Sequence, residues 1–188
     1  MNDLLALALA VRERYLEALL ESLAAFTDQH QASAPEVMFQ LQRDEPLPYR
    51  LHRADMAAHN AGSPTIQEVN PSTHLSFEPF GLEFTEGVTA AVSPFVWNDV
   101  GVQINTTMPA QPVEDWAMRW LDLEDQFPKD EHGLQGVIHS VYREDAADGS
   151  TLLTVDFGSA PIDALKELIE LAFSAGASHV SIYSQTLQ

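Results

Sequence analysis

The sequence lacks cysteine and is poor in basic residues, and each shortage excludes a class of function. Its 188 residues contain no Cys, which excludes disulfides, thiolate zinc sites and a Cys nucleophile. Only 9 Lys and Arg stand against 28 Asp and Glu, so the formal net charge is −19 at pH 7. Nucleic-acid binders and proteins of anionic membrane surfaces both need cationic side chains. We therefore expect no nucleic acid and no membrane among the partners.

The one apolar run that resembles a targeting segment is too short to be one. It extends from Leu4 to Val11 and is ended by Arg12. A membrane-spanning helix needs about 20 apolar residues. The run is preceded by the acid Asp3 instead of a base, and no small-residue cleavage site follows it. We expect a soluble, cytoplasmic protein that is not exported by a cleaved signal.

Apolar residues are otherwise plentiful enough to build a core. They make up 45% of the chain, whereas charged residues make up 20%. The length fits one domain or two small ones. We expect either a division into 1–81, a helix with short strands, and 82–188, an α+β unit, or one continuous domain over 1–188.

Residues 3–26 are predicted to form one long helix. Apolar residues recur there at steps of three and four, namely Leu5, Leu9, Leu16, Leu19, Leu20, Leu23 and Phe26. Asn2 or Asp3 could cap its N-terminus. The first three turns are apolar nearly all round. They are therefore expected to be buried within the domain or, in a sharper hypothesis, against a second copy in a homodimer.

The segment that follows is rich in Pro and Gly, which allows only short strands. After a polar linker at 27–34, alternating apolar residues predict a strand near 37–41. Further on, the pattern predicts short strands at 49–51, 65–69 and 75–77 and a helical turn near 54–59.

From residue 82 onwards the pattern predicts a regular alternation of elements. Strands are expected at 88–92, 100–104, 134–142 and 152–157 and around Val180 and Ile182, and helices from Pro112 to about 126 and from Pro161 to Gly176. Asp148-Gly149 marks a hairpin turn. The order over 100–184 is strand, helix, strand, strand, helix, strand. This order predicts a ferredoxin-like βαββαβ unit with both helices on one face of an antiparallel sheet.

The charges are distributed unevenly along the chain. No Lys or Arg occurs between Arg53 and Arg119. Acids cluster in the segment 114–131, as Glu114, Asp115, Asp122, Glu124, Asp125, Asp130 and Glu131. Asp115, Asp122 and Asp125 would share one face of the predicted helix. A solvated helix face explains one such cluster, but the net charge favours a docking surface for a basic protein, because a field of one sign speeds encounter with the opposite sign.

The three Trp residues are candidates for either the core or an interface, where Trp is a favoured anchor. Trp116 and Trp120 are spaced for packing a helix on a sheet. Trp97 lies between Phe95 and Asn98 in a segment without a clear period. We therefore include Trp97 with the seven acids as a predicted partner-binding residue.

The histidines and glycines give no signature of a metal, cofactor or phosphate site. The seven His residues are His30, His52, His59, His74, His132, His139 and His179, and no two share a metal-ligand spacing. His139 and Asp156, on paired strands, could form a dyad suited to acid–base chemistry. Ser140 and Ser159 are near in sequence, but no spacing ties a nucleophile to the dyad. We favour a structural pair and expect no metal and no cofactor.

Three functional hypotheses remain. In general character (small, acidic, without cysteine or catalytic signature) the chain is similar to immunity proteins, which neutralise bacterial toxins; the similarity covers no defined stretch, so it assigns no residue roles. The first hypothesis is accordingly a non-enzymatic, immunity-type inhibitor that covers the active site of a basic toxin or effector. The second is an adaptor or chaperone for a secreted effector protein. The third is a small-molecule enzyme or sensor built around His139 and Asp156.

Overall fold

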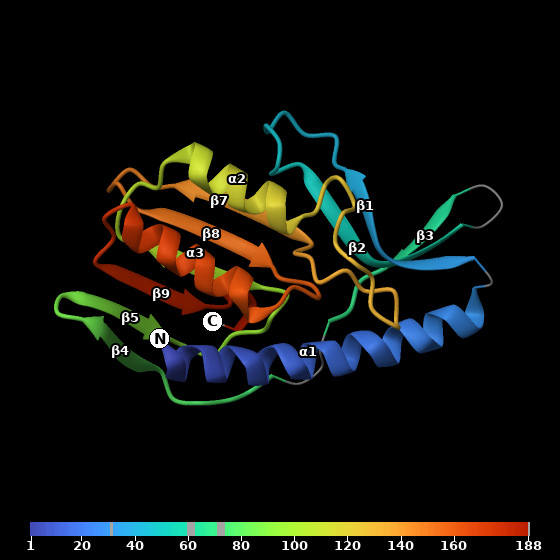
Figure 1. The fold of residues 1–188 in the computed structure, drawn as a ribbon, viewed down its shortest axis with the longest axis horizontal. Helices are drawn as coiled ribbons and strands as arrows, with labels where there is room; N and C mark the ends of the chain where they lie inside the picture. Colours follow the sequence, from blue (N-terminus) through green and yellow to red (C-terminus); the bar gives the residue numbers. More distant parts are fainter. Residues whose placement is uncertain (31, 60–62, 71–73, 188) are drawn as a thin grey trace.

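The computed structural model describes residues 1–30, 32–59, 63–70 and 74–187, and these residues form an α+β fold (Figure 1). The helices are α1 Asn2–Gln29, α2 Ala110–Trp120 and α3 Ile162–Ser174, with a 3₁₀ turn at Gln185–Leu187. The strands are β1 Ser33–Gln40, β2 Leu51–His59, β3 Pro64–Gln67, β4 Phe80–Thr85, β5 Val88–Val92, β6 Val100–Ile104, β7 Ser140–Asp145, β8 Thr151–Asp156 and β9 His179–Tyr183. Among the described residues, none of the helices combines the length and apolar character needed to cross a membrane.

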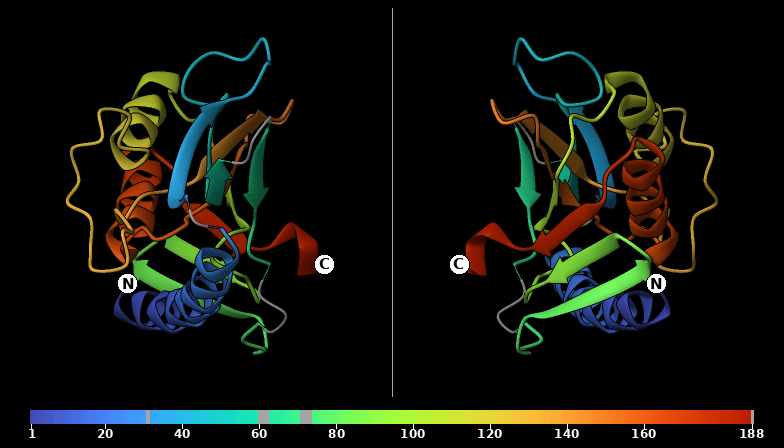
Figure 2. Two further views of the ribbon diagram at one scale, coloured as in Figure 1. Left: turned by 90° about the vertical axis from the view of Figure 1, so that its right-hand side faces the viewer. Right: turned by 90° about the vertical axis from the view of Figure 1, so that its left-hand side faces the viewer.

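Helix α1 confirms the prediction for 3–26 and extends it at both ends. Its 28 residues give a length of about 42 Å. It runs past α3 and on to β1 and β2, and it contacts all three elements (Figures 1 and 2). The buried face consists of Leu4, Ala8, Val11, Tyr15, Leu19, Leu23 and Phe26. Leu9, expected in the buried stripe, is 40% exposed, and the cap position is Met1 without a side-chain cap.

The smaller sheet has the order β1-β2-β3, with both pairings antiparallel. The prediction of a helical turn near 54–59 was wrong, because those residues lie in β2. Ala54 and Ala58 favour helices intrinsically, but β2 is the central strand, and most of its residues are buried. Burial on both faces removes the alternation that would have identified a strand. The strand predicted at 65–69 is confirmed over 65–67, where β3 lies, and residues 75–77 form no strand.

The larger sheet has the order β4-β5-β9-β6-β8-β7. Strand β9 lies between β5, to which it is parallel, and β6, to which it is antiparallel. The predicted element order over 100–184 is confirmed, and in the row β9, β6, β8, β7 each strand is antiparallel to its neighbour. The ferredoxin-like assignment itself stays a prediction, since β5 and β4 continue the sheet beyond β9.

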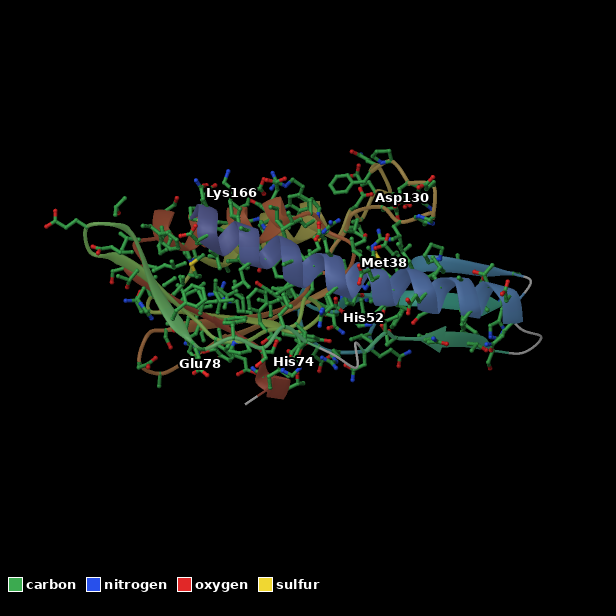
Figure 3. All side chains as sticks on the ribbon, turned by 90° about the horizontal axis from the view of Figure 1, so that it is seen from below. Met38, His52, His74, Glu78, Asp130 and Lys166 are labelled. Atoms are coloured by element: carbon green, nitrogen blue, oxygen red, sulfur yellow. The ribbon has the colours of Figure 1, made fainter. Side chains whose placement is uncertain are left out.

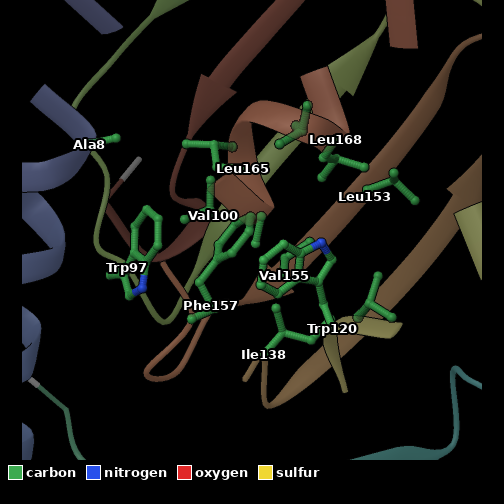
Figure 4. Close-up of a cluster of buried hydrophobic side chains, with 14 of the residues drawn as sticks. Ala8, Trp97, Val100, Trp120, Ile138, Leu153, Val155, Phe157, Leu165 and Leu168 are labelled. Carbon is green, nitrogen blue, oxygen red and sulfur yellow. The ribbon is translucent and has the colours of Figure 1, made fainter. Parts of the chain in front are cut away.

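Helices α2 and α3 cover one face of the larger sheet, and a single apolar core lies between the layers (Figures 2 and 4). Figure 4 shows Trp97, Phe157 and Trp120 together with aliphatic residues of β8 and α3. The same core includes Ala8 of α1 and Met56 of β2. Strand β4 crosses the predicted boundary at 81/82, and its pairing with β5 joins both sides of that boundary in one sheet.

Candidate functional site

The acidic segment 114–131 is only partly helical, because α2 ends at Trp120 and not near 126 as predicted. Arg53 of β2 caps this end of the helix, because its guanidinium donates to the carbonyls of Leu121 and Asp122 at 2.8 to 3.0 Å. The last carbonyls of a helix lack intrahelical partners, and Arg53 supplies donors to them. Asp122 and Asp125 adopt positive φ of 48° and 55°. The acids beyond Trp120 therefore lie on a long loop outside the two helices (Figure 2).

Most of the predicted acids are exposed, as docking would require. Asp115, Glu124, Asp125, Asp130 and Glu131 are exposed, and Glu114 is half-buried. Among the described residues, no Lys or Arg forms an ion pair with any of these six, since Arg119 pairs with Glu167 instead. Asp130 projects at the rim of the loop (Figure 3).

Two of the acids also hold the loop in place. Asp122 is 4% exposed, and its carboxylate accepts from the amides of Gln126 and Phe127, both at 2.8 Å. Asp130 accepts from the amides of His132 and Leu134 at 2.8 and 2.9 Å. Asp122 is thus a structural residue at the base of the loop, and it offers little charge to a partner.

Trp97 does not lie on the surface. Its side chain is fully buried and packs on Phe157, with ring centroids 4.7 Å apart (Figure 4). In this structure it cannot contact a partner, so we do not retain it in the docking surface. Trp116 and Trp120 pack in the core as expected, and their indole nitrogens donate to Ala164 O and to the Glu167 carboxylate.

The structure also contains a buried ionic cluster around His139, which lies just before β7. The His139 side chain has no exposed surface. Its Nε2 bonds to Glu36 Oε1 at 3.0 Å, and its Nδ1 lies 3.1 Å from Asp55 Oδ1, although without the angle of a good hydrogen bond. Asp156 Oδ1 is 4.0 Å from Nδ1. We call these four residues the His139 cluster.

Residues of α1, of both sheets and of two loops contribute to the His139 cluster. Tyr15 of α1 donates its hydroxyl proton to Asp55 Oδ1 at 2.6 Å, and the hydroxyl of Ser159 donates to Glu36. The amide of Gln135 donates to Glu36 Oε2 at 2.5 Å. Glu36 belongs to β1, Asp55 to β2 and Asp156 to β8, so the cluster joins both sheets to α1.

The cluster shifts the pKa values of its members. Burial alone would lower the pKa of His139, but the carboxylates of Asp55 and Glu36 outweigh it and hold that pKa well above its usual value. Burial would raise the pKa of Asp55, but the adjacent His139 imidazole and the hydrogen bond from Tyr15 bring it below the usual range. For Asp156, burial dominates and raises the pKa to about 7. His139 is therefore a buried cation, and Asp156 titrates near neutrality.

Gly158 is required beside the cluster for steric reasons. A Cβ on Gly158 would lie 2.2 Å from His139 Cδ2, and the residue has φ of +46°. The neighbouring stretch Gly158–Pro161 is bonded to α1. The guanidinium of Arg12 donates to the carbonyls of Ser159 and Ala160 at 2.9 and 2.6 Å.

The sequence pattern identified part of this cluster and missed the rest. The pairing of His139 with Asp156 follows from the hairpin, in which Ser140 pairs with Asp156. Glu36 and Asp55 come from the segment where the strands were poorly defined. Acids are depleted in strands, so an acid in the middle of an apolar strand was the available signal. Within the described ranges, no group of three or more His, Asp or Glu is arranged to hold a metal ion.

Chemically, the cluster can store and exchange a proton, but it offers no approach to a substrate. The imidazole is completely enclosed by protein, and catalysis requires a reacting group within hydrogen-bond reach of the base. Comparison with protein families, with curated proteins and with solved structures gave no match.

Proposed function

We propose that this protein is a non-enzymatic binding module of the immunity type, acting in the cytoplasm, which captures a basic toxin or effector and covers its active site. The observation that carries the proposal is a set of exposed acids on α2 and the loop that follows it, none of which is paired with a Lys or Arg among the described residues. We call Asp115, Glu124, Asp125, Asp130 and Glu131 the acidic surface.

The charge of the acidic surface is available to a partner because no Lys or Arg among the described residues pairs with it, and Glu131 has only His132 beside it, at 3.7 Å. Asp115 and Glu124 bond only to neutral side chains, those of Gln111 and Gln126, at 2.8 and 2.5 Å. Such bonds orient a carboxylate without cancelling its charge. Unpaired charges of one sign raise the rate of encounter with an oppositely charged protein by about 10- to 1,000-fold, and salt suppresses the effect.

The loop that carries most of these acids is also held in position before binding. Arg53 is 4% exposed and holds the carbonyls at the start of the loop, while Asp122 and Asp130 bond to amides within it. A surface that is ordered in advance loses less conformational entropy on association. This rigidity suits tight capture of one cognate partner.

The His139 cluster supports the non-enzymatic reading. A dyad intended for catalysis would face a cleft, whereas His139 has no exposed surface and Asp156 is 16% exposed. The cluster joins α1 to both sheets, which is the role of a structural linkage. We assign it to folding and stability.

The test compares two variants that lose the same charge in different places. The surface variant carries Asp115→Asn, Glu124→Gln and Glu131→Gln; the control carries Asp3→Asn, Glu17→Gln and Glu21→Gln, all exposed positions on α1. The partner is first isolated from the native cell with the wild-type chain as bait and identified by mass spectrometry. Association rates are then measured at about 50 and 300 mM salt.

We expect the surface variant to associate about tenfold more slowly at low salt and to lose most of its salt dependence. The control should retain both, because its charges lie outside the acidic surface. Equal rates for the two variants, or a wild-type rate that salt does not change, would contradict the proposal.

A further inference from the structure

A hollow lies beside the C-terminal end of α2, between the helix and the loop that follows it. It encloses about 570 Å³, including the space open to solvent. Its apolar lining consists of Met118, Leu123 and Phe127. The volume is within the usual range for a ligand site, so the hollow is large enough to receive a side chain of another protein.

The three apolar side chains are held in place without being fully covered. Leu123 is 42% exposed, whereas Met118 and Phe127 are half-buried and pack against the core. The Phe127 ring meets Trp120 edge to face, with ring centroids 6.0 Å apart, and its amide donates to the Asp122 carboxylate at 2.8 Å. A single exposed Leu is ordinary, but three apolar side chains around one hollow form a patch, and a fixed apolar patch is typical of an interface anchor.

A second hollow adjoins the first, because Arg119 lines both of them. It lies between α2 and α3 and encloses about 590 Å³, again including open space. Trp116 of α2 and Leu171 of α3 contribute its apolar surface. Helix α2 therefore presents two neighbouring hollows with apolar walls.

Acids lie at the edge of both hollows. Glu124 lines the first and Asp115 lines the second, and both side chains are exposed. The base that lines both hollows, Arg119, forms its ion pair with Glu167. Lys129 is exposed in the same loop but lines neither hollow. An occupant that complements this surface carries positive charge beside its apolar group.

We infer that the first hollow receives an apolar side chain of the basic partner, and that Lys or Arg residues flanking this side chain lie against Glu124 and Asp115. The inference rests on the proposed function, because the side chain belongs to the partner that is captured. It supplies the anchor that charge alone does not provide. Attraction between opposite charges mainly speeds encounter, whereas a buried apolar anchor slows dissociation.

The experiment uses three peptides as probes and needs no knowledge of the partner. N-acetylated tripeptide amides of sequence Arg-Leu-Arg, Arg-Ala-Arg and Glu-Leu-Glu are titrated into the full chain and followed by ¹H–¹⁵N amide shifts. The first two differ in apolar area, and the first and third differ in charge. The variants are Leu123→Ala, Glu124→Gln and the matched control Leu9→Ala, since Leu9 is 40% exposed but lies on α1.

Arg-Leu-Arg should give saturable shifts in residues 118–127 and should bind about threefold more tightly than Arg-Ala-Arg, because Leu buries more apolar surface. Glu-Leu-Glu should give no saturable shift. Leu123→Ala should weaken Arg-Leu-Arg about threefold and leave Arg-Ala-Arg nearly unchanged, while Leu9→Ala should change neither. Glu124→Gln should weaken both arginine peptides.

Three results would overturn the inference. They are the absence of saturable shifts in residues 118–127, equal affinity of the wild-type chain and Leu123→Ala for Arg-Leu-Arg, and binding of Glu-Leu-Glu as tight as that of Arg-Leu-Arg.

The outcome is separable from that of the proposed function. With the isolated partner, Leu123→Ala should raise the dissociation rate about threefold and leave the association rate nearly unchanged, whereas the acidic-surface variant acts on association. Probe binding that depends on Leu123 upholds the hollow even when the acidic-surface variant associates normally. Conversely, inert probes overturn the hollow even when association with the partner depends on salt.

Discussion

Asp156 should make the protein less stable as the pH rises through the neutral range, and Asp156→Asn should remove that loss. The side chain is 16% exposed and lies 4.0 Å from His139. Burial raises its pKa to about 7 from an ordinary value of 3.8. The substitution is nearly isosteric, and the amide oxygen can still accept from the amide of Gly158, as the carboxylate does at 2.9 Å.

The sign follows from where the proton is held more tightly. Because the folded pKa is the higher one, the folded state binds the Asp156 proton more tightly than the unfolded chain. This contribution to stability is fully present below pH 3.8 and is lost as the pH rises to about 7. At about 1.4 kcal/mol per pKa unit, the ceiling is about 4 kcal/mol. Solvent at the exposed part of the side chain reduces this, so we expect about 1–3 kcal/mol.

The measurement is urea unfolding followed by tryptophan fluorescence, from pH 4.5 to 8.5, for the wild-type chain and Asp156→Asn. The difference in unfolding free energy between the two should change by about 1–3 kcal/mol across this range, in favour of the variant at high pH. Asp28→Asn, an exposed acid at the end of α1, is the control and should follow the wild type. If the curve of Asp156→Asn parallels that of the wild type throughout, Asp156 does not titrate near neutrality and our account of the cluster is wrong.

Two further predictions concern the groups that hold the cluster and the loop together. Gly158→Ala should lower the free energy of unfolding by more than about 3 kcal/mol, measured by heat or urea, because its Cβ would overlap the His139 ring. Gly87→Ala is the control: Gly87 also has a positive φ but nothing lies within 4 Å, so the loss should be only about 1 kcal/mol. Similar losses for the two variants would show that backbone strain alone is responsible. Arg53→Lys should lower the free energy of unfolding by about 2–4 kcal/mol, because an ammonium cannot reproduce the forked hydrogen bonds to the carbonyls of Leu121 and Asp122. Amide hydrogen exchange should also become faster in residues 122–127. Unchanged exchange there would mean that the loop keeps its shape without Arg53.

The sequence predicted those parts of the fold in which local pattern and tertiary packing agree. Helix α1 and strands β5 and β6 have regular periods, and Gly149 at φ +84° matches the expected hairpin turn. In each of these the local preference and the final environment favour the same structure.

The misses occur where a distant residue overrides the local pattern. The end of α2 is capped by Arg53, which is 68 residues away from Leu121 in sequence, and no local property of 121–126 reveals this contact. Likewise, Glu36 and His139 are separated by 103 positions and come together only when β1 packs against the larger sheet. Part of the candidate site was therefore accessible from exposed acids in the sequence, whereas the buried cluster required the tertiary structure.

The position of β9 has a consequence for how the chain acquires its structure. This strand lies between β5 and β6 and, among the strands that the structure describes, it alone connects the β4–β5 hairpin laterally to the rest of that sheet. On a ribosome, the two halves must wait unjoined until residues 179–183 emerge, with the edges of β5 and β6 open to other chains in the meantime. Completion of the sheet therefore has to wait for β9, and fragments that stop before His179 should be prone to aggregate.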